Sequence, residues 1–199
     1  MAVAMFNDLS SPLALLSTRR SGKARDMVAP GPDAAQLQQI LAIAARVPDH
    51  GKLAPWRFVI IDADQRRAFG AMLTAAYLSE KPDAGRLEQE AMVQFAEQAP
   101  TMVALLSTPV LSSKIPLWEQ QLSAGSVAMQ LLNAVHASGF VGNWLTGWPS
   151  TSAGVATALG ATNDQDRIVG FLFIGTAARS LEERPRPILS EIVAHWRAK

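Results

Sequence analysis

The sequence has no cysteine among its 199 residues, and this absence excludes disulfide bonds, thiolate metal sites and thiol nucleophiles together. Long apolar runs are missing too: the longest, IVGFLFIG, has the length of a strand and is much too short to cross a bilayer. Metal-ligand spacing such as HxxxH is absent, as are the motifs GxSxG, GxGxxG and GK[ST]. We therefore predict no metal site and assign no catalytic side chain.

The sequence also has no excess of charge of either sign, because it contains 18 basic and 17 acidic residues. Proteins that bind nucleic acid usually have a basic excess, so we expect no nucleic-acid partner. Residues 1–21 have no basic residue ahead of their apolar stretch and no clear cleavage site. We expect no signal peptide, no membrane segment and a cytoplasmic location. The mean hydropathy of +0.12 suggests that part of the surface is covered at a subunit interface.

The length fits one domain of ordinary size, and we treat residues 1–199 as a single domain with a C-terminal arm from about residue 179. Apolar spacing, caps and breaker residues predict a short helix that begins at Pro12, and further helices over 37–44, 64–79, 83–98, 116–138, 151–159 and 189–196. They predict strands over 56–62, 101–107, 140–147 and 166–177. Helices and strands mix without strict βαβ alternation, which favours an α+β fold. The near-continuous apolar run in 166–177 indicates a sheet covered by helices on both faces.

The segment RVPDHGKLAPW, Arg46 to Trp56, carries more charge than a connector needs. Its prolines and glycine supply the turn, yet Arg46, Asp49, His50 and Lys52 are added within seven positions. Either it is a solvated loop, or it holds polar groups against something that is not protein.

Two basic motifs lie near the two ends of the sequence. RRS, Arg19 to Ser21, combines two guanidinium groups with a hydroxyl, a donor set suited to phosphate. The alternative is a helix end whose positive charge complements the helix dipole. RPRP, Arg184 to Pro187, is a basic pair that prolines keep extended, or a solvated tail. Together the two motifs could hold one phosphate from different sides.

Two further segments favour a flat ligand or close packing. FVGNWLTG, residues 140–147, has glycines on either side of Trp144, so a planar ligand could approach its backbone; the alternative is a buried core tryptophan. SAGSVA, residues 123–128, suits close helix packing at a subunit interface. The three histidines lie on different predicted elements, and His136 fits a core position. The sequence thus offers hydrogen-bond donors for a phosphate and a polar ring, and few side chains that could carry out chemistry themselves. This combination is typical of an enzyme whose cofactor supplies the reactive centre.

These motifs resemble those of the FMN-dependent nitroreductases, and most closely the short NAD(P)H nitroreductase subgroup. In that subgroup aPDH…PWrF and WEQemSAG recur, and here the segments read VPDHGKLAPWRF and WEQQLSAG. DRIVGFLFIGT also matches, and the likeness spans about Leu15 to Pro187. It implies a homodimeric α+β fold with a central mixed sheet, helices on both faces, and two FMN molecules at the subunit interface.

The resemblance also implies which residues bind the cofactor. Arg19, Arg20 and Ser21 would hold the FMN phosphate and ribityl end, with Arg184 and Arg186 from the arm. Lys23 would approach the pyrimidine side of the flavin, Arg46 and His50 would reach the cofactor of the opposite subunit, and the backbone of Trp144, Leu145 and Thr146 would face the ring edge near N5. Many relatives have NxQPW where this chain has KLAPW, so Lys52 is not an expected site residue.

The activity that the resemblance implies is ping-pong electron transfer. NADH or NADPH would deliver hydride to flavin N5, and a nitroaromatic or quinone-like acceptor would then take the electrons. The alternatives are a dimeric flavin-binding module without significant turnover, a specialised flavin oxidoreductase of the same fold, and a purely structural protein.

Overall fold

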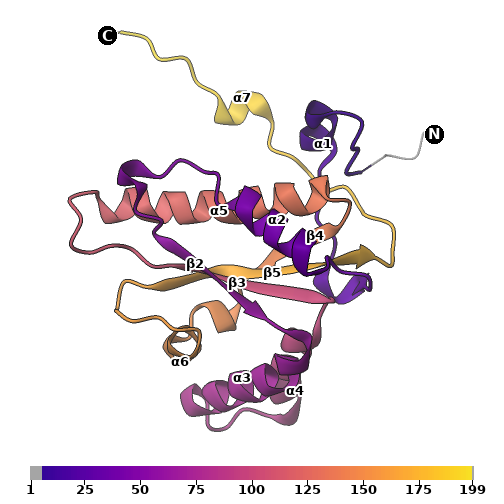
Figure 1. Ribbon diagram of the computed structural model, residues 1–199, viewed down its shortest axis with the longest axis vertical. Coiled ribbons are helices and arrows are strands. Elements are labelled where there is room, and N and C mark those ends of the chain that lie inside the picture. Colours follow the sequence, from indigo (N-terminus) through magenta and orange to yellow (C-terminus); the bar gives the residue numbers. More distant parts are fainter. Residues whose placement is uncertain (1–5, 199) are drawn as a thin grey trace.

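The computed structural model of the protein describes residues 6–198, and Figure 1 shows a sheet between two layers of helices. The strands are β1 (Met27–Val28), β2 (Trp56–Ile61), β3 (Thr101–Ser107), β4 (Val141–Leu145) and β5 (Arg167–Ala177). β5 pairs with β1, β3 and β4, and β3 pairs in turn with β2. Each of these pairs is antiparallel. The α+β class is confirmed, whereas the expected mixed sheet is antiparallel throughout the described residues.

The helices cover both faces of the sheet, as predicted. They are α1 (Pro12–Thr18), α2 (Ala34–Ala44), α3 (Arg66–Glu80), α4 (Arg86–Glu97), α5 (Leu117–Ala137), α6 (Ala153–Ala158) and α7 (Leu189–Ile192), with 3-10 turns η1 (Ala24–Asp26), η2 (His50–Lys52), η3 (Ala63–Gln65) and η4 (Trp148–Ser150). In Figure 1, α2 and α5 lie on one face, and α3, α4 and α6 lie on the other.

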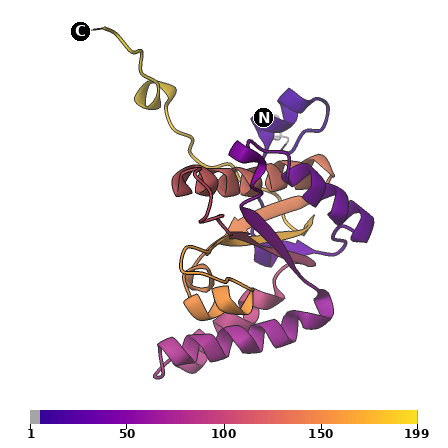
Figure 2. The ribbon, with the colours of Figure 1, turned by 60° about the vertical axis from the view of Figure 1, so that its left-hand side comes forward.

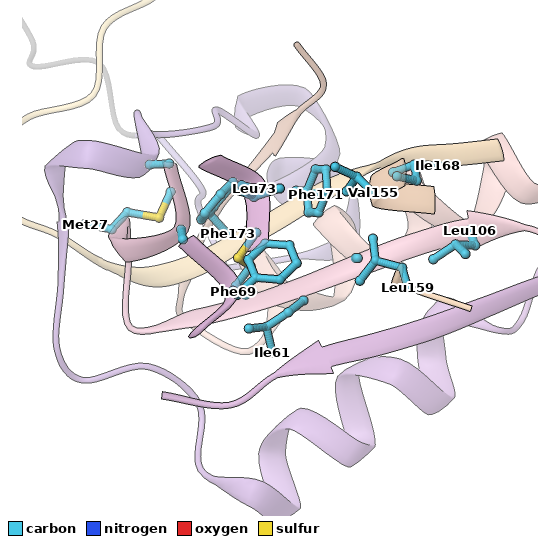
Figure 3. Packing of buried hydrophobic residues seen from close by; sticks show 14 residues of the cluster. Met27, Ile61, Phe69, Leu73, Leu106, Val155, Leu159, Ile168, Phe171 and Phe173 are labelled. Carbon is cyan, nitrogen blue, oxygen red and sulfur yellow. The ribbon is translucent and has the colours of Figure 1, made fainter. Parts of the chain in front are cut away.

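The two faces bury separate hydrophobic clusters because side chains alternate along each strand. On β5, Phe171 and Phe173 pack toward α3 and α4, while Leu172 and Ile174 pack toward α2 and α5. Figure 3 shows the first cluster. Phe95 of α4 packs against this cluster and meets Phe171 and Phe173 edge-on at ring distances of 5.2 and 5.3 Å. β5 is therefore buried on both faces, as its apolar run predicts.

Local signals set several of the element boundaries. The Ser11 hydroxyl accepts a hydrogen bond from the Ala14 N–H at 3.0 Å, and Pro12 begins α1, as predicted. α5 ends at Ala137, and Gly139 follows with a φ of 81°, which confirms the predicted stop. The two-residue strand β1 was not predicted, because a dipeptide carries no periodic signal.

Beyond β5 the chain forms an arm that leaves the body, as Figure 2 shows. The predicted amphipathic helix is reduced to the single turn of α7. Its apolar side chains are 58% to 88% exposed: Ile188, Leu189, Ile192, Val193 and Trp196. Burial against another surface would therefore stabilise this arm. None of the helices within residues 6–198 is long and apolar enough to span a membrane.

Candidate functional site

The segment from Arg19 to Lys23 joins α1 to η1, and asparagine side chains hold its backbone at two points. The Asn7 amide accepts from the Arg20 N–H at 2.7 Å and donates to the Arg20 carbonyl at 3.2 Å. Asn143 of β4 donates to the carbonyl of Gly22. The backbone at Arg20 and Gly22 is thus held in place, and Arg19 lies at the C-terminal end of α1.

A cavity of about 420 Å³ opens beside this segment. Its walls come from the segment itself, α5, β4 and the C-terminal arm: Arg19, Arg20, Ser21, Gly22, Lys23, Leu132, Asn143, Trp144, Leu145, Arg184 and Arg186. The volume falls in the range of roughly 300–1,000 Å³ that is usual for small-molecule sites. The structure therefore brings the two basic motifs together across almost the whole length of the chain.

Positive charge is concentrated at this cavity. The pKa of Arg19 is lowered, first because the guanidinium is partly buried and then because Arg186, Arg20 and Arg184 lie near it. Burial and the neighbouring positive charges each disfavour the charged form of Arg19. Arg19 also donates from Nη1 to the Ser21 hydroxyl at 3.2 Å, so a guanidinium and a hydroxyl converge. A bound anion would relieve the repulsion among these cations.

Two glutamates of the arm offset part of that charge. The Glu182 carboxylate lies 3.7 Å from Lys23 Nζ, and the Glu183 carboxylate accepts from Arg186 at 2.9 Å. All four side chains are exposed, so each ion pair contributes little stability. These carboxylates can give way to a ligand anion at low cost.

Trp144 is fixed at the edge of the cavity by contacts with β5. Its indole N–H donates to the Val169 carbonyl at 3.0 Å. The indole lies over Gly170, where an added Cβ would be 2.1 Å from Nε1. Gly170 also has a φ of 155° beside the bulge between Leu105 and Leu106 of β3. A glycine at this bulge is therefore what lets the indole lie against the strand. Thr146, which follows β4, is exposed and does not line the cavity.

The loop before β2 is internally braced. The Asp49 carboxylate accepts from the N–H groups of Leu53 at 3.1 Å and Ala54 at 2.8 Å. Lys52 and Ala54 have φ values of 56° and 46°, an uncommon conformation for residues other than glycine. Such strain persists only where surrounding contacts enforce it. These contacts fix the conformation of the loop, so it is more than a plain solvated connector.

This loop is also tied to α5, but it does not reach the cavity of its own chain. His50 Nδ1 lies 2.8 Å from the Glu119 carboxylate, and the Ser123 hydroxyl donates to the Pro48 carbonyl at 2.6 Å. Arg46 and His50 are exposed and are not among the residues that line the cavity. One chain alone therefore does not bring them to the other predicted site residues.

Sequence reasoning missed the residues that hold the site in place. Asn7 and Asn143 act through hydrogen bonds to backbone atoms, and their partners lie 13 and 121 positions away. Asn143 belongs to the segment FVGNWLTG, but only Trp144 and its glycines drew attention there. No local pattern marks Asn7.

The comparisons with known proteins identify the family of this chain. Residues 16–176 match the model of the nitroreductase family, and the chain belongs to that family. It is 36% identical over 164 residues to the Escherichia coli (strain K12) protein named "Putative NAD(P)H nitroreductase YdjA", a match that covers 82% of this chain and 87% of the relative.

Two solved structures share the fold. A nitroreductase-like family protein from Bacillus cereus has a TM-score of 0.79 at 16% identity, over 98% of this chain and 99% of its own. A protein from Exiguobacterium sibiricum described as a "putative nitroreductase in complex with FMN" has a TM-score of 0.68 at 20% identity, over 94% of this chain and 98% of its own.

Proposed function

We propose that this chain is an FMN-dependent NAD(P)H oxidoreductase of the nitroreductase type. The observation that carries the proposal is the gathering of Arg19, Arg184 and Arg186 at one cavity, where burial and then the neighbouring arginines lower the pKa of Arg19. A phosphate monoester, with a charge of about −1.5 to −2 at neutral pH, suits that donor set. Further support comes from the NAD(P)H nitroreductase name of the Escherichia coli relative and from FMN in the Exiguobacterium structure.

In this proposal Ser21 and three arginines, Arg19, Arg184 and Arg186, bind the phosphate and ribityl end of FMN. Arg20 lines the same cavity. Lys23, on the same segment, provides a positive charge for the pyrimidine side of the flavin. A cation there stabilises the negative charge of reduced flavin near N1 and O2, and the effect is stronger in a partly dry site. Glu182 neutralises part of the charge of Lys23, so we expect the contact between the two side chains to weaken when FMN binds.

The backbone of Trp144, Leu145 and Thr146 is proposed to face the ring edge near N5. Bound FMN would supply hydride acceptance from NADH or NADPH, followed by electron delivery to a nitroaromatic or quinone-like acceptor in a ping-pong cycle. The protein's own part is to orient the two substrates in turn. A fixed indole at Trp144 and a clamped Arg19–Lys23 segment lower the entropy cost of that orientation.

We propose a homodimer because two of the elements with exposed apolar side chains suit a subunit interface. The arm is one, and α5 is the other, where Trp118, Leu122 and Met129 recur at spacings of four and seven residues. The loop that carries Arg46 and His50 is bonded to α5 beside this apolar stripe. A second copy covering the stripe would meet these two side chains, which fits their proposed reach toward the other subunit's cofactor. The cytoplasmic location stays a prediction.

The test is the absorbance spectrum of the purified protein, followed by anaerobic addition of NADH or NADPH. We expect flavin bands that bleach on addition of the donor. A protein that stays colourless after incubation with FMN would overturn the proposal, and flavin that binds but never bleaches would indicate a binding module. The double variant Arg19→Ala, Ser21→Ala should lose its FMN, and a fully yellow double variant would contradict the proposed phosphate contacts.

A further inference from the structure

The C-terminal arm is attached to the body through the side chain of Arg20. Its Nε donates to the Glu182 carbonyl at 2.5 Å, while the Asn7 amide holds the backbone on both sides of the same residue. Within residues 6–198, Glu182 is the last arm residue that hydrogen-bonds to the body. Later hydrogen bonds, such as the one between Arg186 and Glu183, stay inside the arm.

This attachment limits where the basic pair of the arm can lie. Arg184 and Arg186 follow Glu182 by two and four residues, and an extended chain spans at most about 3.6 Å per residue. With Glu182 held, the two arginines stay within roughly 7 and 14 Å of it. Without that hold, Glu182 keeps only the exposed ion pair of its carboxylate with Lys23 at 3.7 Å, which contributes little stability. The next ion pair back along the arm is the Arg179–Asp26 pair at 3.9 Å.

The two arginines of RRS have different partners. Arg19 donates to the Ser21 hydroxyl, and in an extended segment side chains two apart lie on the same side. Arg20, between them, donates to a backbone carbonyl of the arm. Arg20 also forms part of the cavity wall, so direct contact with a phosphate is the competing role for it.

We propose that Arg20 is a positioning residue that fastens the C-terminal arm and so holds Arg184 and Arg186 at the cavity. Its consequence for cofactor affinity rests on the proposed FMN site. Arm attachment and phosphate binding are then coupled, because each orders the residues that the other needs.

The first experiment uses protein without cofactor. Glutamyl endopeptidase cleaves after Glu182 and Glu183, and Glu191 in the exposed α7 serves as an internal reference. We expect Arg20→Ala to raise cleavage at Glu182 and Glu183 relative to Glu191, as followed by mass spectrometry. Arg179→Ala is the matched control, because it removes an equal charge from the start of the arm and leaves the Arg20 bond in place. Equal cleavage in Arg20→Ala and in the control would overturn the proposal.

The second experiment is a double-mutant cycle on ligand affinity. Arg20→Ala is combined with the arm variant Arg184→Ala, Arg186→Ala, and FMN and riboflavin affinities are measured by quenching of flavin fluorescence. We expect Arg20→Ala alone to weaken FMN binding roughly 10- to 100-fold, about as much as the arm variant, with little effect on riboflavin. In the arm-variant background the same change should cost less than about 3-fold, because its target is already gone.

Additive losses would show that Arg20 binds the phosphate directly, and the proposal would fall. An equal loss for riboflavin and FMN would indicate a damaged fold and would count against it too. If the unaltered protein binds no FMN, the proposed function fails, whereas the cleavage experiment on ligand-free protein still decides whether Arg20 fastens the arm.

Discussion

Acid should destabilise this protein through one buried histidine. His136 on α5 is 1% exposed, its Nε2 accepts from the Gly142 N–H at 3.3 Å, and its Nδ1 has no hydrogen-bond partner among the described residues. Burial, and then the charge of Arg19, lower its pKa to about 4. Protonation would place a proton on the nitrogen that accepts from Gly142, so a hydrogen bond is lost as a charge is buried.

The direction and size of the effect follow from linkage. Between the unfolded pKa of 6.5 and the folded pKa of about 4, the unfolded chain binds more protons than the folded one. Stability is therefore complete above pH 6.5 and falls as the pH drops toward 4. At about 1.36 kcal/mol per pH unit, the total loss is roughly 3 kcal/mol, of which about 2 kcal/mol occurs between pH 7 and pH 5.

The assay is urea unfolding followed by far-UV circular dichroism at pH 7 and pH 5, at one protein concentration. His136→Gln removes the titrating group, so we expect its free energy of unfolding to change by much less between the two pH values. His195→Gln, at an exposed position of the arm, is the control and should keep the full loss. An undiminished pH dependence in His136→Gln would refute the assignment to this side chain.

Three further changes test other contacts. Gly170→Ala should displace the indole of Trp144 and cost about 1–3 kcal/mol in urea unfolding, because the new methyl group would overlap Nε1; an unchanged midpoint would count against this packing. Arg66→Met should cost about 3–5 kcal/mol, since the buried guanidinium donates to several backbone carbonyls at 2.8 to 3.4 Å, whereas exposed Arg67→Met should stay within about 0.5 kcal/mol. Lys23→Met should slow flavin reduction in stopped-flow measurements while FMN still binds, and unchanged reduction kinetics would remove Lys23 from its proposed role.

Much of the fold follows from local sequence signals. Residues 101–107 form β3 within the bounds that their apolar run predicts, and β5 is buried on both faces as its continuous run requires. β1 escaped prediction because its pairing depends on the far end of β5, where Met27 lies opposite Ala177. The all-antiparallel order also depends on long-range pairing, which periodicity within a strand does not report.

The sequence predicted those residues of the candidate site that belong to a recognisable motif. It did not predict the residues that hold the site through hydrogen bonds to backbone atoms. Arg19 and Ser21 are a donor set suited to phosphate by residue type and spacing, and both line the cavity; their binding of a phosphate stays a prediction. The bond from Arg20 ends on the Glu182 carbonyl, which every residue type offers, so no letter of the sequence signals it. The sequence gives no sign of the role of Asn7 either, because its amide bonds to main-chain atoms 13 positions away.

The cavity unites a segment that begins at Arg19 with an arm that reaches Arg186. During translation the first half of this proposed phosphate site leaves the ribosome long before the second half exists. The sheet and both hydrophobic clusters end at β5, so they can form while the site is still incomplete. A truncation just before Arg184 would therefore leave a folded body that lacks the two arginines of the arm. Such a variant should lose its flavin while it keeps its structure.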